Sequence, residues 1–141
     1  MSPSASFLHP LRPIRGLVDA PGLGPSSCAE QRDGATGIRI AGLAHITGGG
    51  ITENLPRVLP RGTAAVIGLG SWPVQPIFEH LQKLGDVPKE EMLRTFNMGL
   101  GMLLIVPANK FKKAQMLLER AGEKVYTVGR IVKGDRKVLY S

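Results

Sequence analysis

Hydrophobic and polar positions follow two different periods along the part of the chain that begins near residue 37. Apolar or alternating runs of strand length lie at residues 38–46, 63–69, 98–107, 124–132 and 137–140. Between them, apolar residues recur every three or four positions at 76–84 and 109–120, which predicts two amphipathic helices. This order predicts an α/β fold of the layered α+β type, in which helices pack on one mixed sheet.

Several residues mark where these elements begin and end. Asn109 is expected to cap the longer helix, which runs to about Arg120. Gly134-Asp135 is expected to form the turn into the last strand. Trp72 follows the second strand, and we interpret it as a packing residue of the core; stacking on an adenine ring is the alternative, with no pattern to support it.

The first 36 residues differ in composition from the rest. Pro, Gly and Ser supply 14 of the first 35 positions, and large apolar residues follow no period. We therefore expect residues 1–36 to be a disordered leader and residues 37–141 to be the folded domain. An organellar transit peptide is the alternative for the leader, because Arg12 and Arg15 lie in a stretch without acids, although two prolines would interrupt a helix there.

Length and composition narrow the class of protein. A chain of 141 residues has room for one domain, and no apolar run approaches the roughly 20 residues that a membrane-spanning helix needs. The single cysteine, Cys28, lies outside every motif and suits a reducing compartment, while three scattered histidines give no metal-binding pattern. We expect a cytoplasmic protein with no metal site of its own and no membrane partner.

The net charge of +7 raises the question of nucleic-acid binding. Its distribution argues against this, because residues 110–141 carry nine basic and three acidic side chains and hold most of the excess. These bases are typical of the solvated face of an amphipathic helix, and the few aromatic residues nearby are too spread out to stack on bases. No nucleic-acid partner is expected.

Three consecutive glycines follow the first strand. After Thr47 come Gly48, Gly49 and Gly50, and the next residues are compatible with a short helix until Pro56. Backbone N–H groups at such a position can bind a phosphate. A tight turn is the alternative, and the stretch matches neither the P-loop nor the dinucleotide-binding pattern.

Four motifs in series resemble one enzyme family. They are His45-Ile-Thr-Gly-Gly-Gly50, Glu53-Asn-Leu-Pro-Arg-Val-Leu-Pro60, Ser71-Trp-Pro73 with Ile77-Phe78, and Glu91-Met-Leu-Arg-Thr-Phe-Asn-Met-Gly-Leu-Gly-Met102. In order and separation they resemble the C-terminal domain of phosphoribosylformylglycinamidine cyclo-ligase, the aminoimidazole ribonucleotide synthetase of purine biosynthesis.

The resemblance implies an ATP-dependent ligase. In that family, ATP with Mg²⁺ phosphorylates the formyl oxygen of formylglycinamidine ribonucleotide, and an internal amine then closes the imidazole ring by forming a C–N bond. The complete enzyme is a homodimer whose N-terminal half binds ATP. Because this chain resembles the C-terminal domain alone, we expect that it does not bind ATP and Mg²⁺ by itself.

The resemblance also suggests roles for individual residues. His45 would be the catalytic hydrogen-bond donor or proton shuttle, and the substrate-binding residues would be Thr47, Gly48, Gly49, Gly50 and Asn97. The alternatives are structural: a buried histidine for His45, a helix-ending residue for Asn97 and a surface polar group for Asn54. Glu53 and Arg57 are interpreted as a short-range ion pair.

The family-like sequence begins abruptly near Ile38. We therefore expect a truncated product whose leader is not native to the fold. The alternative to an enzyme is a non-catalytic remnant that binds a ribose phosphate, or a subunit that needs a separate N-terminal half. Loss of half of an interface predicts an exposed apolar patch.

Overall fold

A six-stranded sheet organises the computed structural model, which describes residues 14–20, 31–32 and 38–141. Its strand order is β4-β6-β1-β7-β5-β8, with parallel and antiparallel pairs. The predicted mixed sheet is therefore confirmed. The strands are β1 (Ile14–Ala20), β4 (Gly42–His45), β5 (Thr63–Ile67), β6 (Leu100–Pro107), β7 (Val125–Lys133) and β8 (Val138–Tyr140); a separate pair is formed by β2 (Gln31–Arg32) and β3 (Arg39–Ile40).

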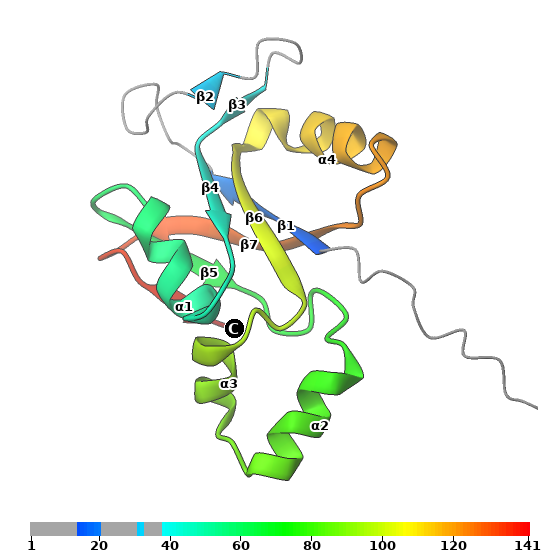
Figure 1. Cartoon of the computed structure of the whole chain (residues 1–141). Coiled ribbons are helices and arrows are strands. Elements are labelled where there is room, and N and C mark those ends of the chain that lie inside the picture. The colour runs from blue at the N-terminus through cyan, green and yellow to red at the C-terminus, as the bar shows by residue number, and fades with distance from the viewer. Residues whose placement is uncertain (1–13, 21–30, 33–37) are drawn as a thin grey trace, which may run out of the picture.

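The helices gather at two ends of this sheet (Figure 1). Near the start of β6, α1 packs on α3, and α3 contacts α2, whereas α4 packs on β1, β6 and β7. The predicted layering of helices on a sheet is thus confirmed. Their bounds are α1 (Gly50–Asn54), α2 (Pro76–Gly85), α3 (Lys89–Thr95) and α4 (Phe111–Arg120), with 3-10 turns η1 (Leu55–Val58) and η2 (Ala108–Lys110).

Strand β1 lies at the centre of the sheet, in the region where the sequence predicted a disordered leader. It pairs in parallel with β6 on one side and with β7 on the other, so that Val18 lies opposite both Ile105 and Gly129. The expectation of disorder does not hold for this strand, because two partner strands supply hydrogen bonds that composition alone does not reveal. Most of the leader lies outside the described residues, and the domain boundary at residue 36 stays a prediction.

The turn predicted at Gly134-Asp135 leads into the last strand, but β8 does not pair with β7 as it would in a hairpin. Strand β5 lies between β7 and β8, antiparallel to the first and parallel to the second. Two hydrogen bonds attach this turn to the start of β5: the Gly134 N–H donates to Gly62 O (3.1 Å), and the Arg136 N–H donates to Thr63 O (2.6 Å). These two bonds hold the chain as it crosses the start of β5 and reaches the edge of β5 that faces away from β7.

Helix α4 begins one residue later than predicted. Asn109 lies within η2 rather than at the helix cap, and Lys110 holds the cap position without a side-chain hydrogen bond. The reason is that the chain leaves β6 through a 3-10 turn that starts after Pro107. The amphipathic pattern itself is confirmed, because Ala114 is buried against the sheet.

Two apolar clusters form the core of the described residues. The larger joins the sheet to α1 and η1 and includes Trp72, which is 4% exposed and donates its Nε1–H to Met98 O (2.9 Å). The predicted packing role of Trp72 is confirmed. The smaller cluster lies between the sheet and α4.

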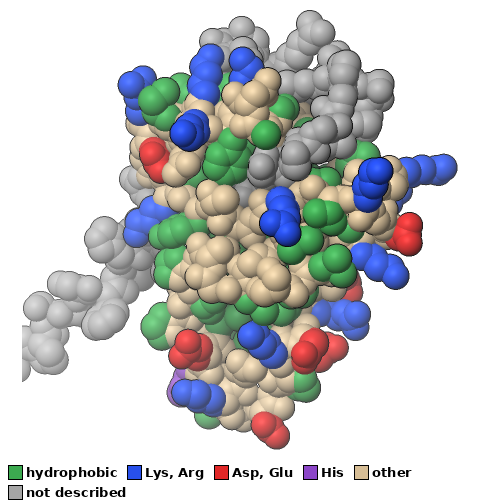
Figure 2. All heavy atoms as spheres, turned by 180° about the vertical axis from the view of Figure 1, so that it is seen from behind, with side chains coloured by type: hydrophobic (Ala, Val, Ile, Leu, Met, Phe, Trp, Pro, Cys, Tyr) green, Lys and Arg blue, Asp and Glu red, His purple; other side chains and the backbone are tan. Residues whose placement is uncertain are grey.

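Helix α2 contrasts with this core. It buries no residue, and Ile77, Leu81 and Leu84 leave an apolar stripe on its surface. On the face seen in Figure 2, Lys and Arg side chains are spread out, with Asp and Glu between them. Among the helices that the structure describes, none is long and apolar enough to cross a membrane.

Candidate functional site

The predicted phosphate loop lies where β4 ends and α1 begins. We call Thr47, Gly48, Gly49 and Gly50 the glycine loop. Thr47 and Gly48 are exposed, Gly49 is half-buried and Gly50 is buried. His45 is the last residue of β4 and is exposed, so it is not the buried histidine of the structural alternative. The predicted order of strand, glycines and helix start is confirmed.

Helix α1 is too short for its dipole to attract an anion strongly. It has five residues, which is about one and a half turns. A helix of this length contributes little dipole to an anion at its N-terminus. Any binding of an anion must therefore depend on individual N–H groups of the loop backbone.

Gly50 owes its identity to its close contact with α3. It has a left-handed φ of 58°, next to Gly49 at 95°, and a Cβ at Gly50 would lie 2.0 Å from Leu93 O and 2.8 Å from Phe96 O. Only glycine fits there. The Gly50 N–H already donates to Thr47 O (3.0 Å), so Gly50 shapes the loop and is not free to contact a ligand.

The other two glycines face more open space. A Cβ at Gly48 would meet no atom within 4 Å, whereas a Cβ at Gly49 would meet the Glu53 side chain. Within the described part of the chain, the N–H groups of Gly48 and Gly49 donate to no protein acceptor. Gly48 and Gly49 thus supply the donors that the loop can offer to a ligand.

Asn54 holds the loop from the inside, a role that the sequence did not suggest. It is 7% exposed, and its Nδ2 donates to the carbonyl oxygens of Gly50 (2.8 Å), Gly48 (3.1 Å) and, at 3.5 Å, Thr47. Asn54 is therefore not the surface polar group that we expected. The available signal was its spacing, because a residue four positions after Gly50 lies on the same face of the helix.

Thr52 ties α1 to two neighbouring elements. Its hydroxyl lies 2.7 Å from the Tyr140 hydroxyl of β8 and donates to Leu93 O of α3 at 3.3 Å. Either hydroxyl can be the donor in the contact between Thr52 and Tyr140. Burial raises the pKa of Tyr140, and the hydrogen bond with Thr52 partly offsets that rise.

Asn97 lies beside the glycine loop but is engaged in a turn. Its Oδ1 accepts the Gly99 N–H (2.9 Å), and its carbonyl oxygen accepts the Leu100 N–H (2.9 Å). The preceding residue, Phe96, places its carbonyl oxygen next to Gly50. The structure therefore brings the Asn97 turn close to the loop, and among the described residues the side-chain NH₂ group has no hydrogen-bond partner.

The ion pair predicted at Glu53 has a different partner. Glu53 Oε1 lies 3.8 Å from Arg94 Nε, and Arg94 also lies 3.6 Å from Glu91; no ion pair with Arg57 is found among the described residues. Helix α3 packs on α1 and brings Arg94 within reach, which the sequence distance concealed. The Glu53 carboxylate next to Gly49 opposes the binding of an anion there.

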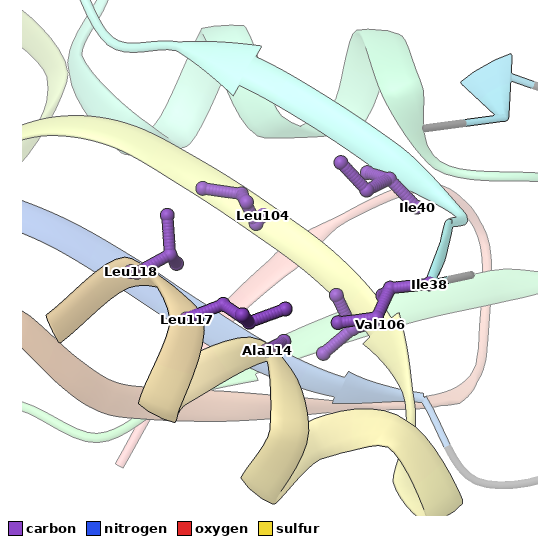
Figure 3. Close-up of a pocket in the computed structure, with 7 residues that line it drawn as sticks. All are labelled: Ile38, Ile40, Leu104, Val106, Ala114, Leu117 and Leu118. Atoms are coloured by element: carbon purple, nitrogen blue, oxygen red, sulfur yellow. The ribbon is translucent and has the colours of Figure 1, made fainter. Parts of the chain in front are cut away.

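Among the described residues, hollows also lie away from the glycine loop. A cavity of 220 Å³ lies between α4, β6 and the segment around β3, and its described lining is entirely aliphatic (Figure 3). A more polar hollow of 420 Å³ lies between β5 and β7, where Ser71, Thr127 and Arg130 contribute polar atoms. Neither has the convergent polar groups of a catalytic site, and the described residues contain no group of three or more metal-ligating side chains.

The chain is similar to a group of known enzymes. Residues 22–141 match the sequence model of the AIR synthase related protein, C-terminal domain. The chain is 50% identical over 102 residues to a phosphoribosylformylglycinamidine cyclo-ligase of Brevibacillus brevis, covering 72% of this chain and 30% of that protein. It is 55% identical over 93 residues to the cyclo-ligase of Bifidobacterium animalis subsp. lactis, covering 66% and 27%.

A longer relative gives the same result. A bifunctional purine biosynthetic protein of Dictyostelium discoideum is 54% identical over 107 residues, covering 72% of this chain and 13% of that protein. The chain thus spans less than a third of the length of these relatives. With the family match extending over residues 22–141, the chain belongs to the family of AIR synthase related proteins, as its C-terminal domain.

Proposed function

We propose that this chain is the C-terminal part of the ATP-dependent cyclo-ligase that closes the imidazole ring of aminoimidazole ribonucleotide from formylglycinamidine ribonucleotide. The observation that carries the proposal is identity of about half over roughly 100 residues to enzymes of that name. The family match includes the whole glycine loop. The complete enzyme would be a cytoplasmic homodimer of de novo purine biosynthesis.

In this proposal the glycine loop binds the ribose phosphate of the substrate. The N–H groups of Gly48 and Gly49, which have no acceptor among the described residues, and the hydroxyl of exposed Thr47 are the donors. His45 lies two residues before Thr47 on the same exposed edge and acts as the hydrogen-bond donor or proton shuttle. Asn97 adds a polar contact from the neighbouring turn.

ATP and Mg²⁺ belong to the complete enzyme in this proposal. Mg²⁺ prefers several oxygen ligands, and the described residues of this chain contain no cluster of three carboxylate, histidine or cysteine side chains. The nucleotide would be held by the half of the enzyme to which this chain shows no match.

A second function is favoured by the exposed apolar surface of α2. The chain could serve as a non-catalytic ribose-phosphate-binding remnant, or as a subunit that pairs with a separate N-terminal half. The exposed apolar residues Ile77, Leu81 and Leu84 on α2 agree with a surface that is covered in a larger assembly.

Two measurements separate these functions. The purified chain is incubated with formylglycinamidine ribonucleotide, ATP and Mg²⁺, alone and with a separately produced N-terminal half of a related cyclo-ligase, and ring closure is followed. In parallel, ribose 5-phosphate is titrated into the ¹⁵N-labelled chain. Turnover by the chain alone would identify an enzyme, and turnover only with the added half would identify a subunit.

Binding without turnover in either mixture would identify a remnant. In that case the amide signals of Gly48 and Gly49 move on titration, while no ring-closed product accumulates. If the chain shows no binding and no turnover in either mixture, both functions are contradicted.

A further inference from the structure

We infer that Asn54 is the positioning residue of the glycine loop, which turns the loop carbonyls inward so that the N–H groups of Gly48 and Gly49 face a ligand. This inference rests on the proposed function of the loop. It goes beyond that function because it assigns the shape of the binding surface to a side chain that does not touch the substrate. The evidence is geometric.

The first step concerns the directions of the C=O and N–H groups in the planar peptides of the loop. In a trans peptide the C=O group of one residue and the N–H group of the next point in opposite directions. Asn54 Nδ2 donates to Gly48 O at 3.1 Å, so the Gly49 N–H points away from Asn54. The longer contact to Thr47 O at 3.5 Å directs the Gly48 N–H in the same way.

The second step concerns Gly50, whose N–H and C=O groups belong to two successive peptide planes. Asn54 donates to Gly50 O at 2.8 Å, while the Gly50 N–H is already used by Thr47 O. One side chain therefore fixes the orientation of three peptide planes. The pattern leaves two successive N–H groups facing outward, which is the arrangement of a backbone anion-binding concavity.

The chemistry of the side chain explains why an amide is needed. All three partners of Asn54 are carbonyl oxygens, so the NH₂ group must face them and the amide cannot be flipped. An aspartate has nearly the same shape but would present acceptors to acceptors. A leucine has a similar size but no donor, and it would remove the side-chain hydrogen bonds to Gly48 O and to Gly50 O.

Thr52 provides a matched control on the same helix. Its hydroxyl contacts Tyr140 and Leu93 and no carbonyl of the glycine loop. Thr52→Val therefore removes hydrogen bonds from α1 without releasing the loop. If the Asn54 variants lose binding only because the protein is less stable, Thr52→Val should lose binding as well. If they lose it because the loop is no longer oriented, Thr52→Val should keep it.

The test uses the full chain, labelled with ¹⁵N, in wild-type, Asn54→Asp, Asn54→Leu and Thr52→Val forms. Ribose 5-phosphate and, separately, inorganic phosphate are titrated while the amide signals of Gly48 and Gly49 are followed, and thermal unfolding is recorded for each variant. We expect both Asn54 variants to bind at least about tenfold more weakly than wild type, and Thr52→Val to bind within about twofold. The neutral leucine variant separates loop orientation from the charge that aspartate adds.

The outcomes distinguish the inference from the function on which it rests. If wild type binds and the folded Asn54 variants bind equally well, the positioning role is wrong while the phosphate loop stands. If wild type shows no change at Gly48 and Gly49, both are wrong. Should neither Asn54 variant fold, Asn54→Ser, which keeps one short donor, replaces them; unchanged binding by that variant would also overturn the inference.

Discussion

The Tyr140 hydroxyl lies 2.7 Å from the Thr52 hydroxyl and joins the last strand of the sheet to the helix that follows the glycine loop. The two residues are 88 positions apart in the chain. Because Thr52 also donates to Leu93 O, this contact connects three elements around the candidate site. The contact between Tyr140 and Thr52 holds the side of α1 opposite to the side on which Asn54 bonds to the glycine loop.

Removal of the Tyr140 hydroxyl should destabilise the protein measurably. Tyr140→Phe keeps the ring and loses the hydrogen bond, so we expect a decrease of about 1 kcal/mol in the free energy of unfolding. Urea denaturation followed by circular dichroism measures this. The control is Tyr126→Phe, because Tyr126 is also half-buried but has no hydrogen-bonded hydroxyl among the described contacts; an equal loss in both variants would contradict the prediction.

The stability should also fall at alkaline pH because of Tyr140. Its pKa is raised above the ordinary value of 10.0, chiefly by burial, so the unfolded chain releases this proton at a lower pH than the folded one. The contribution of Tyr140 is therefore fully present below pH 10.0 and is lost as pH rises through the higher folded pKa. Urea midpoints measured between neutral pH and the onset of alkaline unfolding should fall more steeply in wild type than in Tyr140→Phe, and parallel curves would refute the assignment.

Two alanine substitutions in the glycine loop should have very different effects. Gly50→Ala places a Cβ 2.0 Å from Leu93 O at a left-handed φ, so we expect a loss of about 3 kcal/mol or more, or failure to fold. Gly48→Ala places its Cβ in open space and should cost less than about 1 kcal/mol. Chemical denaturation of the pair compares them directly, and equal losses would contradict the packing of α3 on Gly50.

The carboxylate of Glu53 should weaken phosphate binding at the loop. Its Oε2 lies 2.8 Å from the position that a Cβ of Gly49 would take, so Glu53→Gln should tighten the binding of ribose 5-phosphate about threefold at low ionic strength. The gain should shrink as salt is added, because screening weakens the repulsion. Glu90→Gln, which removes an exposed carboxylate from α3, is the control; an equal gain there would point to net charge instead of position.

Proline in β1 tests whether this strand holds the sheet together. Val18 lies opposite Ile105 on β6 and Gly129 on β7, and proline removes a donor from a central strand. We expect Val18→Pro to lower the free energy of unfolding by about 3 kcal/mol or more. Hydrogen exchange of the β6 and β7 amides gives a local readout, and unchanged protection would show that β1 does not pair there.

The sequence by itself determined most elements that follow residue 37 and the order in which they occur, but it missed β1. Apolar or alternating runs indicated β5, β6 and β7, three- and four-residue spacing indicated α2 and α4, and four family motifs identified the enzyme family. These signals are local, because side chains alternate along a strand and recur along a helix according to backbone geometry alone. The glycine triplet could be recognised for the same reason.

Only the tertiary structure decided which elements become neighbours and therefore what each polar residue does. It placed β1 between β6 and β7, β8 on the far edge of β5, and Arg94 beside Glu53. It also gave Gly50 a packing role and turned Asn54 inward, although both belong to a motif that was visible in the sequence. The physical reason is that pairing edges, hydrogen-bond partners and close backbone contacts join residues distant in the chain, and no local pattern encodes those partners.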